Sequence, residues 1–188
     1  MSDGWCECFS LHWELSSFSR GCKTIMPNWC YNNVDITATT QEGKDLLDRI
    51  SRAETADGFF EMFRPIGEWD YHVALEKWGT KWDVDPTDVD YDGTTLSASF
   101  DSAWSPPVAL YEYLVSQGFE VSANYYEPGM DFAGEWVNGD DFYLEDVSEL
   151  ARQDEETLFR LDQREYDILD QWGIFESVAE MDAEEEAE

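Results

Sequence analysis

Acidic side chains dominate this sequence. Of its 188 residues, 43 are Asp or Glu and 11 are Lys or Arg, which gives a formal net charge of −32. Repulsion among so many carboxylates opposes compaction, so the chain needs a large buried apolar area to fold. Nine Trp, nine Tyr and eleven Phe supply that area, because each aromatic side chain buries a large surface. The composition therefore favours one folded domain with an acidic surface over a disordered chain.

The same charge restricts the partners. Direct binding to nucleic acid normally requires a basic patch, and no Lys or Arg occurs between Lys81 and Arg152. An anionic membrane would also repel the chain. The sequence has no apolar run long enough to cross a membrane, and residues 1–25 lack the basic and apolar regions of a signal peptide. We expect a cytoplasmic protein that binds neither nucleic acid nor membrane directly.

Hydrophobic periodicity predicts an α+β fold. Alternating apolar residues predict strands at 30–38, 94–101, 119–126 and 131–137, with a short strand at 81–84 before an acidic loop. Capping and turn residues predict helices at 39–53, 105–117 and 148–172. This order is typical of a ferredoxin-like sandwich, an antiparallel sheet with helices on one face, here with an extra edge strand and a C-terminal helix.

Four stretches together resemble a known family. They are MPNWCYNN from residue 26, WGTKWDVD from 78, SAWSPP from 102 and YYEPGMDFAGEW from 125. In this order they resemble the YubB-type ferredoxin-like proteins of phages, prophages and plasmids, whose members typically open with Met-Pro-Asn-Trp-Cys. The resemblance covers about residues 26–137 and implies a ferredoxin-like fold and a mobile-element setting. It implies no reaction, so no catalytic residue is carried over.

The resemblance also suggests how the chain is divided. Met26 matches the start of the family, so residues 1–25 are interpreted as an N-terminal extension or the product of an upstream start codon. Residues 26–147 form the predicted ferredoxin-like domain. An amphipathic helical region, 148–180, and an acidic tail, 181–188, follow it.

An acidic segment is the first candidate binding surface. Its carboxylates are Asp83, Asp85, Asp88, Asp90 and Asp92. The last three, followed by Gly93, match the first half of a calcium loop, in which alternate carboxylates converge on a hard cation. The position of the closing Glu is Ser99, so a solvated acidic loop is favoured over a calcium site, and no metal is expected.

Aromatic residues form the second candidate. The favoured interpretation is that Trp78, Trp82 and Trp104 fill a core. The functional alternative is a groove for a partner peptide or a base. It would be lined by Trp82, Trp104, Tyr125 and Tyr126. Lys81 is the cation of this motif, and the neighbouring Asp83 is placed to neutralise it.

Enzymatic signals are sparse. His12 and His72 are the only histidines, and the sequence has no Gly-rich phosphate loop, nucleophile elbow or His-Glu-x-x-His motif. The cysteines lack the paired spacing of a zinc site. They are Cys6, Cys8, Cys22 and Cys30. We expect no enzymatic activity, no catalytic residue and no cofactor.

Three functions remain open. The first is an acidic nucleic-acid mimic of a phage or plasmid, which occupies the basic surface of a host protein such as a restriction, CRISPR or other defence component. The second is adaptation to salt, in which the charge carries no information about partners. The third is a structural or assembly accessory of a virus. The first and the third predict a protein that acts by binding, and none of the three predicts catalysis.

Overall fold

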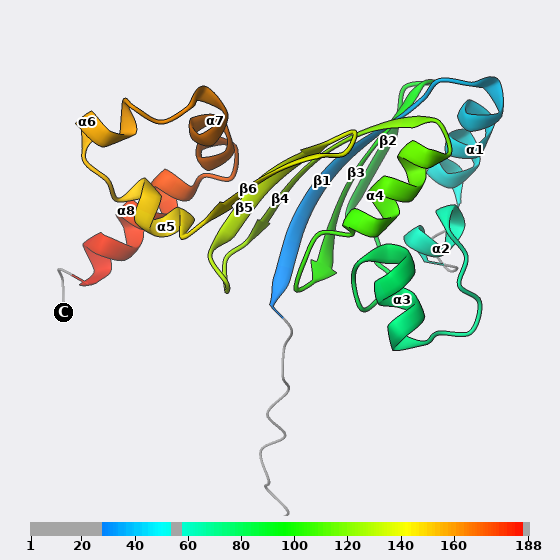
Figure 1. The fold of residues 1–188 in the computed structure, drawn as a ribbon, viewed down its shortest axis with the longest axis horizontal. Helices are drawn as coiled ribbons and strands as arrows, with labels where there is room; N and C mark the ends of the chain where they lie inside the picture. The colour runs from blue at the N-terminus through cyan, green and yellow to red at the C-terminus, as the bar shows by residue number, and fades with distance from the viewer. Residues whose placement is uncertain (1–27, 54–57, 186–188) are drawn as a thin grey trace, which may run out of the picture.

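A six-stranded antiparallel sheet forms the centre of the protein (Figure 1). The computed structural model describes residues 28–53 and 58–185. The strands are β1 (Trp29–Ala38), β2 (Asp88–Tyr91), β3 (Thr95–Ala103), β4 (Phe119–Glu127), β5 (Phe132–Val137) and β6 (Asp140–Glu145). They lie in the order β2-β3-β1-β4-β5-β6, and each pair of neighbours is antiparallel. The predicted α+β class is confirmed.

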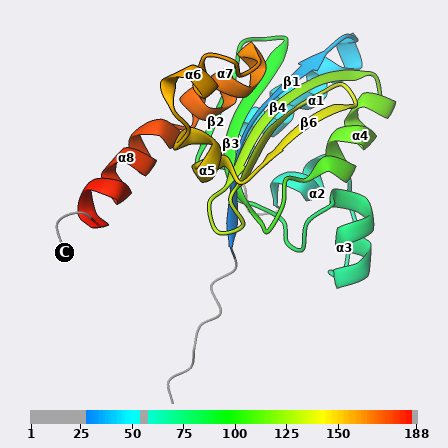
Figure 2. The same cartoon turned by 60° about the vertical axis from the view of Figure 1, so that its left-hand side comes forward.

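The sheet lies between two groups of helices, which Figures 1 and 2 show on its two sides. The first group is α1 (Gln41–Arg52), α2 (Phe59–Phe63), α3 (Tyr71–Trp78) and α4 (Val108–Ser116). The second is α5 (Val147–Ala151), α6 (Glu155–Leu158), α7 (Gln163–Gln171) and α8 (Ile174–Glu185). None of the described helices is long and apolar enough to cross a membrane.

The main core packs α1 to α4 against one face of the sheet. Strand β1 shows why: its residues alternate between buried and exposed positions, as a strand with one covered face requires. The buried side chains that fill this core include Val34, Ile36, Leu47, Phe60, Trp78, Phe100, Leu110, Leu114, Val121 and Trp136. Burial of these side chains supplies the apolar area that offsets the repulsion among the carboxylates.

The expected strand at 81–84 is wrong, and the strand that pairs with β3 lies further along. Strand β2 occupies 88–91, within the segment expected to be an acidic loop. In it, Val89 and Tyr91 pack against the main core, while Asp88 and Asp90 point to the other face. Acidic residues on the solvent side of an edge strand are easily mistaken for a loop, because only half of the residues are apolar.

The C-terminal region also differs from the prediction. Instead of one helix over 148–172, it contains the separate helices α5, α6, α7 and α8, with a break at Gly173, whose φ is 62°. These helices pack on β5 and the unpredicted β6, and helices therefore lie on both faces of the sheet rather than on one. Their shared core contains Ala133, Leu144, Val147, Ile168, Leu169, Ile174 and Val178.

Part of the predicted organisation lies outside the described residues. This applies to the N-terminal extension at 1–25 and to the expected start at Met26. Of the predicted tail at 181–188, the part up to Glu185 belongs to α8, and residues 186–188 are outside the description.

Candidate functional site

Within the described residues, the helices leave one face of β1 to β4 largely uncovered. The helices α1 to α4 cover the opposite face, and α5 to α8 pack mainly on β5 and β6 (Figures 1 and 2). We call the bare surface the open face. Its side chains are Tyr31, Asn33, Asp35, Thr37, Asp88, Asp90, Thr95, Ser97, Ser99, Asp101, Glu120, Ser122, Asn124 and Tyr126.

Strand register places these side chains in rows across the sheet. One row runs from Asp90 through Ser97 and Asp35 to Ser122. The neighbouring row runs from Asp88 through Ser99 and Asn33 to Asn124. Both rows line a shallow hollow that Gln171, at the end of α7, borders on one side. The centre of the open face is therefore polar and lined by short side chains.

Hydrogen bonds across the strands order the centre of the open face. The Ser97 hydroxyl donates to Asp35 Oδ1 over 2.5 Å, and the Ser99 hydroxyl donates to Asn33 Oδ1 over 2.7 Å. Short side chains fixed in this way lose little conformational entropy when a partner binds. The arrangement is suited to docking a rigid surface.

The open face is acidic without compensation. It carries the carboxylates Asp35, Asp88, Asp90, Asp101 and Glu120. Within the described residues none of them has a Lys or Arg nitrogen within 4.0 Å. Partial desolvation raises the pKa of the Asp101 carboxyl. The surface therefore presents negative charge that is available to a cationic partner.

Arg164 on α7 borders this surface without neutralising it. Its guanidinium donates to Glu135 Oε2 over 2.6 Å and to Asp140 Oδ2 over 2.9 Å, and it lies 4.4 Å from the centre of the Phe142 ring. Partial burial opposes the charged form, but the hydrogen bonds to the two carboxylates outweigh it and raise the pKa of Arg164. Its charge is used to clamp α7 to β5 and β6.

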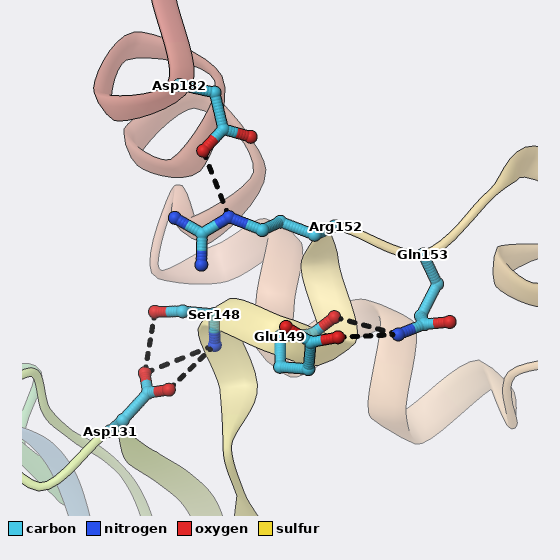
Figure 3. A network of polar contacts seen from close by, with 6 residues as sticks. All are labelled: Asp131, Ser148, Glu149, Arg152, Gln153 and Asp182. Carbon is cyan, nitrogen blue, oxygen red and sulfur yellow. Dashed lines mark hydrogen bonds and ion pairs between the residues drawn. The ribbon is translucent and has the colours of Figure 1, made fainter. Parts of the chain in front are cut away.

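Further polar contacts anchor the C-terminal helices, as Figure 3 shows. Asp131, in the β4–β5 turn, accepts the Ser148 hydroxyl over 2.7 Å and the Ser148 backbone N–H over 3.1 Å. Arg152 Nε donates to Asp182 Oδ1 over 3.0 Å and so connects the end of α5 to α8. The first contact ties α5 to the turn between two strands, and the second ties α8 to α5.

The predicted acidic residues divide into separate roles. Only Asp88 and Asp90 reach the open face, while Asp85 is exposed in a loop. The Asp92 carboxylate accepts the N–H groups of Thr95 and Thr94 at 2.8 Å each, and these bonds lower its pKa. The described residues contain no group of three or more His, Cys, Asp or Glu side chains that is placed to hold a metal ion.

Asp83 has a structural role instead. Its carboxylate accepts the backbone N–H groups of Phe60 at 2.7 Å, Glu61 at 2.9 Å and Val84 at 2.7 Å, and so caps α2. Burial raises the pKa of this carboxyl, although the three donors act in the opposite direction. The expectation that Asp83 neutralises Lys81 is wrong, because no ion pair joins them.

The predicted aromatic groove is not assembled. Tyr125 is buried in the main core, where its hydroxyl donates to Asp141 over 2.6 Å. Tyr126 points to the open face, with its ring centroid 6.4 Å from Tyr31 and 6.0 Å from Trp172. The pair Trp82 and Trp104 forms a separate cluster, with centroids 6.3 Å apart.

The four stretches that carry the family resemblance meet at one end of the sheet. The backbone N–H of Trp104 donates to Asn28 O over 2.9 Å, and the Thr80 hydroxyl donates to Ala103 O over 2.9 Å. Gly129, in the β4–β5 turn, lies so close to Asn28 that an added Cβ would come within 2.6 Å of its side chain. These motifs therefore have a packing role.

The histidine and the cysteine in the described part of the chain both lie apart from the open face. His72 is exposed on α3, next to Tyr71. The thiol of Cys30 is buried in the main core, and burial raises its pKa, so it stays protonated and unreactive. The open face offers hydroxyl, amide and carboxylate groups, and the Ser97 hydroxyl is hydrogen-bonded to the Asp35 carboxylate.

Comparisons with models of protein families, with curated proteins and with solved structures find no match. The function therefore has to be inferred from the geometry and charge of the open face.

Proposed function

We propose that this protein is a binding module whose open face docks on a cationic surface of a partner protein, in the place that nucleic acid would occupy. The observation that carries the proposal is a set of carboxylates on one ordered sheet face that, among the described residues, have no Lys or Arg partner and no helix over them. Asp35, Asp88 and Asp90 form its centre. A partner that binds nucleic acid offers Lys and Arg side chains at matching density.

The spacing of the charges supports mimicry. Alternate residues of a strand lie about 6.6–6.8 Å apart on one face, which separates Asp88 from Asp90. Strands lie about 4.8 Å apart, so Asp35, two strands from Asp90, is about 9.6 Å away. Duplex DNA presents one negative charge per about 1.7 Å of its axis and is bound through cationic grooves. A rigid array of carboxylates satisfies the same side chains and speeds their association.

The topology supports a ferredoxin-like core. The order β2-β3-β1-β4, with α1 to α3 between β1 and β2 and α4 between β3 and β4, is the arrangement of a split βαβ sandwich. On this proposal β5, β6 and α5 to α8 are an addition to that core. The resemblance to YubB-type proteins supports a phage or plasmid origin, and hence a partner in the host cytoplasm such as a restriction or CRISPR component.

Salt adaptation is the second candidate, because acidic residues are not confined to the open face. Exposed carboxylates also occur on the outer sides of α3, α4 and α8, at Glu76, Glu112 and Glu180. On this alternative, the charge maintains hydration of the surface at high salt. Removing the same number of charges then changes the salt dependence of stability equally, wherever on the surface they are removed.

The test compares two variants with the same net charge. Asp35→Asn/Asp88→Asn/Asp90→Asn removes charge from the open face with little change in shape. Glu76→Gln/Glu112→Gln/Glu180→Gln removes the same charge from exposed helix positions. Each full-length protein captures partners from a lysate of the native host, and bound proteins are eluted with competing duplex DNA and identified by mass spectrometry.

Mimicry predicts that the wild type and the helix variant retain a nucleic-acid-binding protein that duplex DNA releases, and that the open-face variant loses it. If both variants lose capture equally, or if duplex DNA releases nothing from the wild type, the mimic proposal is rejected. Equal changes in the salt dependence of stability in the two variants would then favour salt adaptation.

A further inference from the structure

The ammonium group of Lys81 lies against two tryptophans. Its Nζ is 4.2 Å from the ring centre of Trp82 and 5.0 Å from that of Trp104. Both distances lie within the range of about 6 Å at which a cation is attracted to the face of an aromatic ring. The two indole planes are inclined by 36°, with centroids 6.3 Å apart. Trp82, Trp104 and Lys81 together are called the tryptophan pair site.

Lys81 pairs with indoles in a chain that has carboxylates in excess. Within the described residues no carboxylate oxygen lies within 4.0 Å of its Nζ. The nearest candidate in the sequence, Asp83, is occupied by the N–H groups of α2. A half-buried lysine in a chain with a net charge of −32 would be expected to pair with a carboxylate. The indoles therefore form the main local environment of this cation.

The backbone holds Trp104 in a conformation that a bulky residue rarely adopts. Its φ is 70°, in the left-handed region, and its side chain remains 42% exposed. The bond from its N–H to Asn28 O fixes this geometry over 2.9 Å. Strained residues that surrounding contacts hold in place are concentrated at functional sites. Core packing does not explain the strain, because much of the indole faces solvent.

A third tryptophan fixes the loop that carries Lys81. Trp69 Nε1 donates to the backbone carbonyl of Lys81 over 3.1 Å, and Trp69 is 52% exposed. The loop before α3 is thus tied to the loop after it, which places Lys81 beside the indoles of Trp82 and Trp104. Paired aromatic rings of this kind bind organic ammonium groups through their faces.

We propose that Trp82 and Trp104 form a binding site for an organic ammonium ion, such as a quaternary ammonium group or a lysine head group, and that Lys81 is its internal occupant. An external cation has to displace Lys81, which is tethered beside the indoles at high effective concentration. Lys81 therefore competes with weakly binding ligands, and only a cation that binds the two rings more tightly displaces it. The inference does not depend on the proposed role of the open face.

The probe for this site is tetramethylammonium chloride, titrated into the full-length protein. The ¹H–¹⁵N signals of the indole N–H groups of Trp82 and Trp104 report binding. Lys81→Met removes the charge and retains an unbranched side chain, so its site is open. We expect its dissociation constant for tetramethylammonium to be about tenfold lower than that of the wild type, which corresponds to the loss of one competing cation–π contact.

Three controls isolate the cation–π interaction. Lys77→Met removes the same charge from α3 and should bind as the wild type does. The neutral isostere tert-butanol should give no shift of the two indole signals in Lys81→Met. The double variant Lys81→Met/Trp104→Gly should not bind the probe, and glycine adopts the positive φ at this position without strain.

A measurement on the wild type covers the case in which Lys81→Met does not fold. Displacement of Lys81 should raise the rate of its acylation by an amine-reactive reagent several-fold when tetramethylammonium is added, but not when sodium chloride of equal concentration is added. The proposal is overturned if tetramethylammonium leaves this rate unchanged, if Lys81→Met binds no better than Lys77→Met, or if tert-butanol shifts the indole signals equally.

Discussion

Asn32 donates a hydrogen bond from its side-chain Nδ2 to the Ser102 hydroxyl over 2.8 Å, within the main core. It also donates to Cys30 O over 2.7 Å, and its Oδ1 lies 3.5 Å from the Tyr111 hydroxyl. The next residue, Asn33, points to the open face. Two adjacent asparagines in one motif thus have opposite environments, because successive side chains of a strand point to opposite faces.

This contrast predicts unequal losses of stability. Asn32→Ala leaves buried polar partners unsatisfied and should lower the free energy of unfolding by about 2–3 kcal/mol. Asn33→Ala removes only the partner of a half-buried serine hydroxyl and should cost less than about 1 kcal/mol. Urea unfolding of both variants measures the difference. Equal losses would show that the buried hydrogen bonds of Asn32 stabilise the fold no more than the hydrogen bond of Asn33 does.

Two glycines allow the cost of backbone strain to be measured separately from the cost of steric crowding. Gly79 and Gly93 both have positive φ, 88° and 98°. An added Cβ at Gly79 would lie 3.0 Å from the Ala109 backbone nitrogen, whereas at Gly93 nothing lies within 4 Å. Gly93→Ala should cost about 1 kcal/mol from strain alone. Gly79→Ala should cost at least about 2 kcal/mol more, because α4 has to move.

Thermal and urea unfolding of the two alanine variants measure this comparison. If Gly79→Ala lowers the free energy of unfolding no more than Gly93→Ala does, α3 and α4 can move apart at their contact without loss of stability. The contact would then not explain the glycine of the WGTKWDVD stretch.

Asp83 provides a prediction for stability and one for its pH dependence. Asp83→Ala removes the acceptor of three backbone N–H groups and should cost about 1–2 kcal/mol, whereas Asp85→Ala, in an exposed loop, should be nearly neutral. Burial raises the folded-state pKa of Asp83 above its ordinary value of 3.8. The stability that its protonation contributes is therefore fully present below 3.8 and is lost as the pH rises through the folded-state pKa.

Asp83→Asn does not titrate and serves as the reference for that pH dependence. The free energy of unfolding of the wild type, minus that of Asp83→Asn, should fall as the pH rises above 3.8. A difference that grows with pH would mean that the three N–H donors outweigh burial and that the pKa is lowered instead.

Alternation in the sequence was sufficient to predict β1, β3, β4 and β5, because each has apolar side chains at alternate positions against the main core. The edge strands were harder. Strand β2 has four residues, two of them acidic, and β6 begins with Asp140 and Asp141. An edge strand has one neighbour and tolerates charge, so its pattern resembles that of a loop.

The candidate site was predictable only in part. Period-two alternation implies that Tyr125 and Tyr126 face opposite sides of the sheet. Two side chains on opposite faces cannot line one groove, so the sequence alone was sufficient to reject the predicted groove. It did not indicate which face remains bare. That depends on α5 to α8 packing mainly on β5 and β6, which is a matter of tertiary contacts between distant segments rather than of local periodicity.

The clamp at Arg164 is the contact that should matter most for the border of the open face. Its bonds to Glu135 and Asp140 join α7 to β5 and β6, and the Arg164 and Glu135 side chains are only 32% and 28% exposed. Arg164→Met leaves two carboxylates unpaired and should lower stability by about 1–2 kcal/mol, with faster amide hydrogen exchange across α7. Arg160→Met is the matched control, because Arg160 and Glu156 are 73% and 78% exposed and their pair should contribute less than about 0.5 kcal/mol. If exchange in α7 is unchanged in Arg164→Met, the apolar contacts of Ile168 and Leu169 alone hold this helix, and the border of the open face does not depend on the ion pairs.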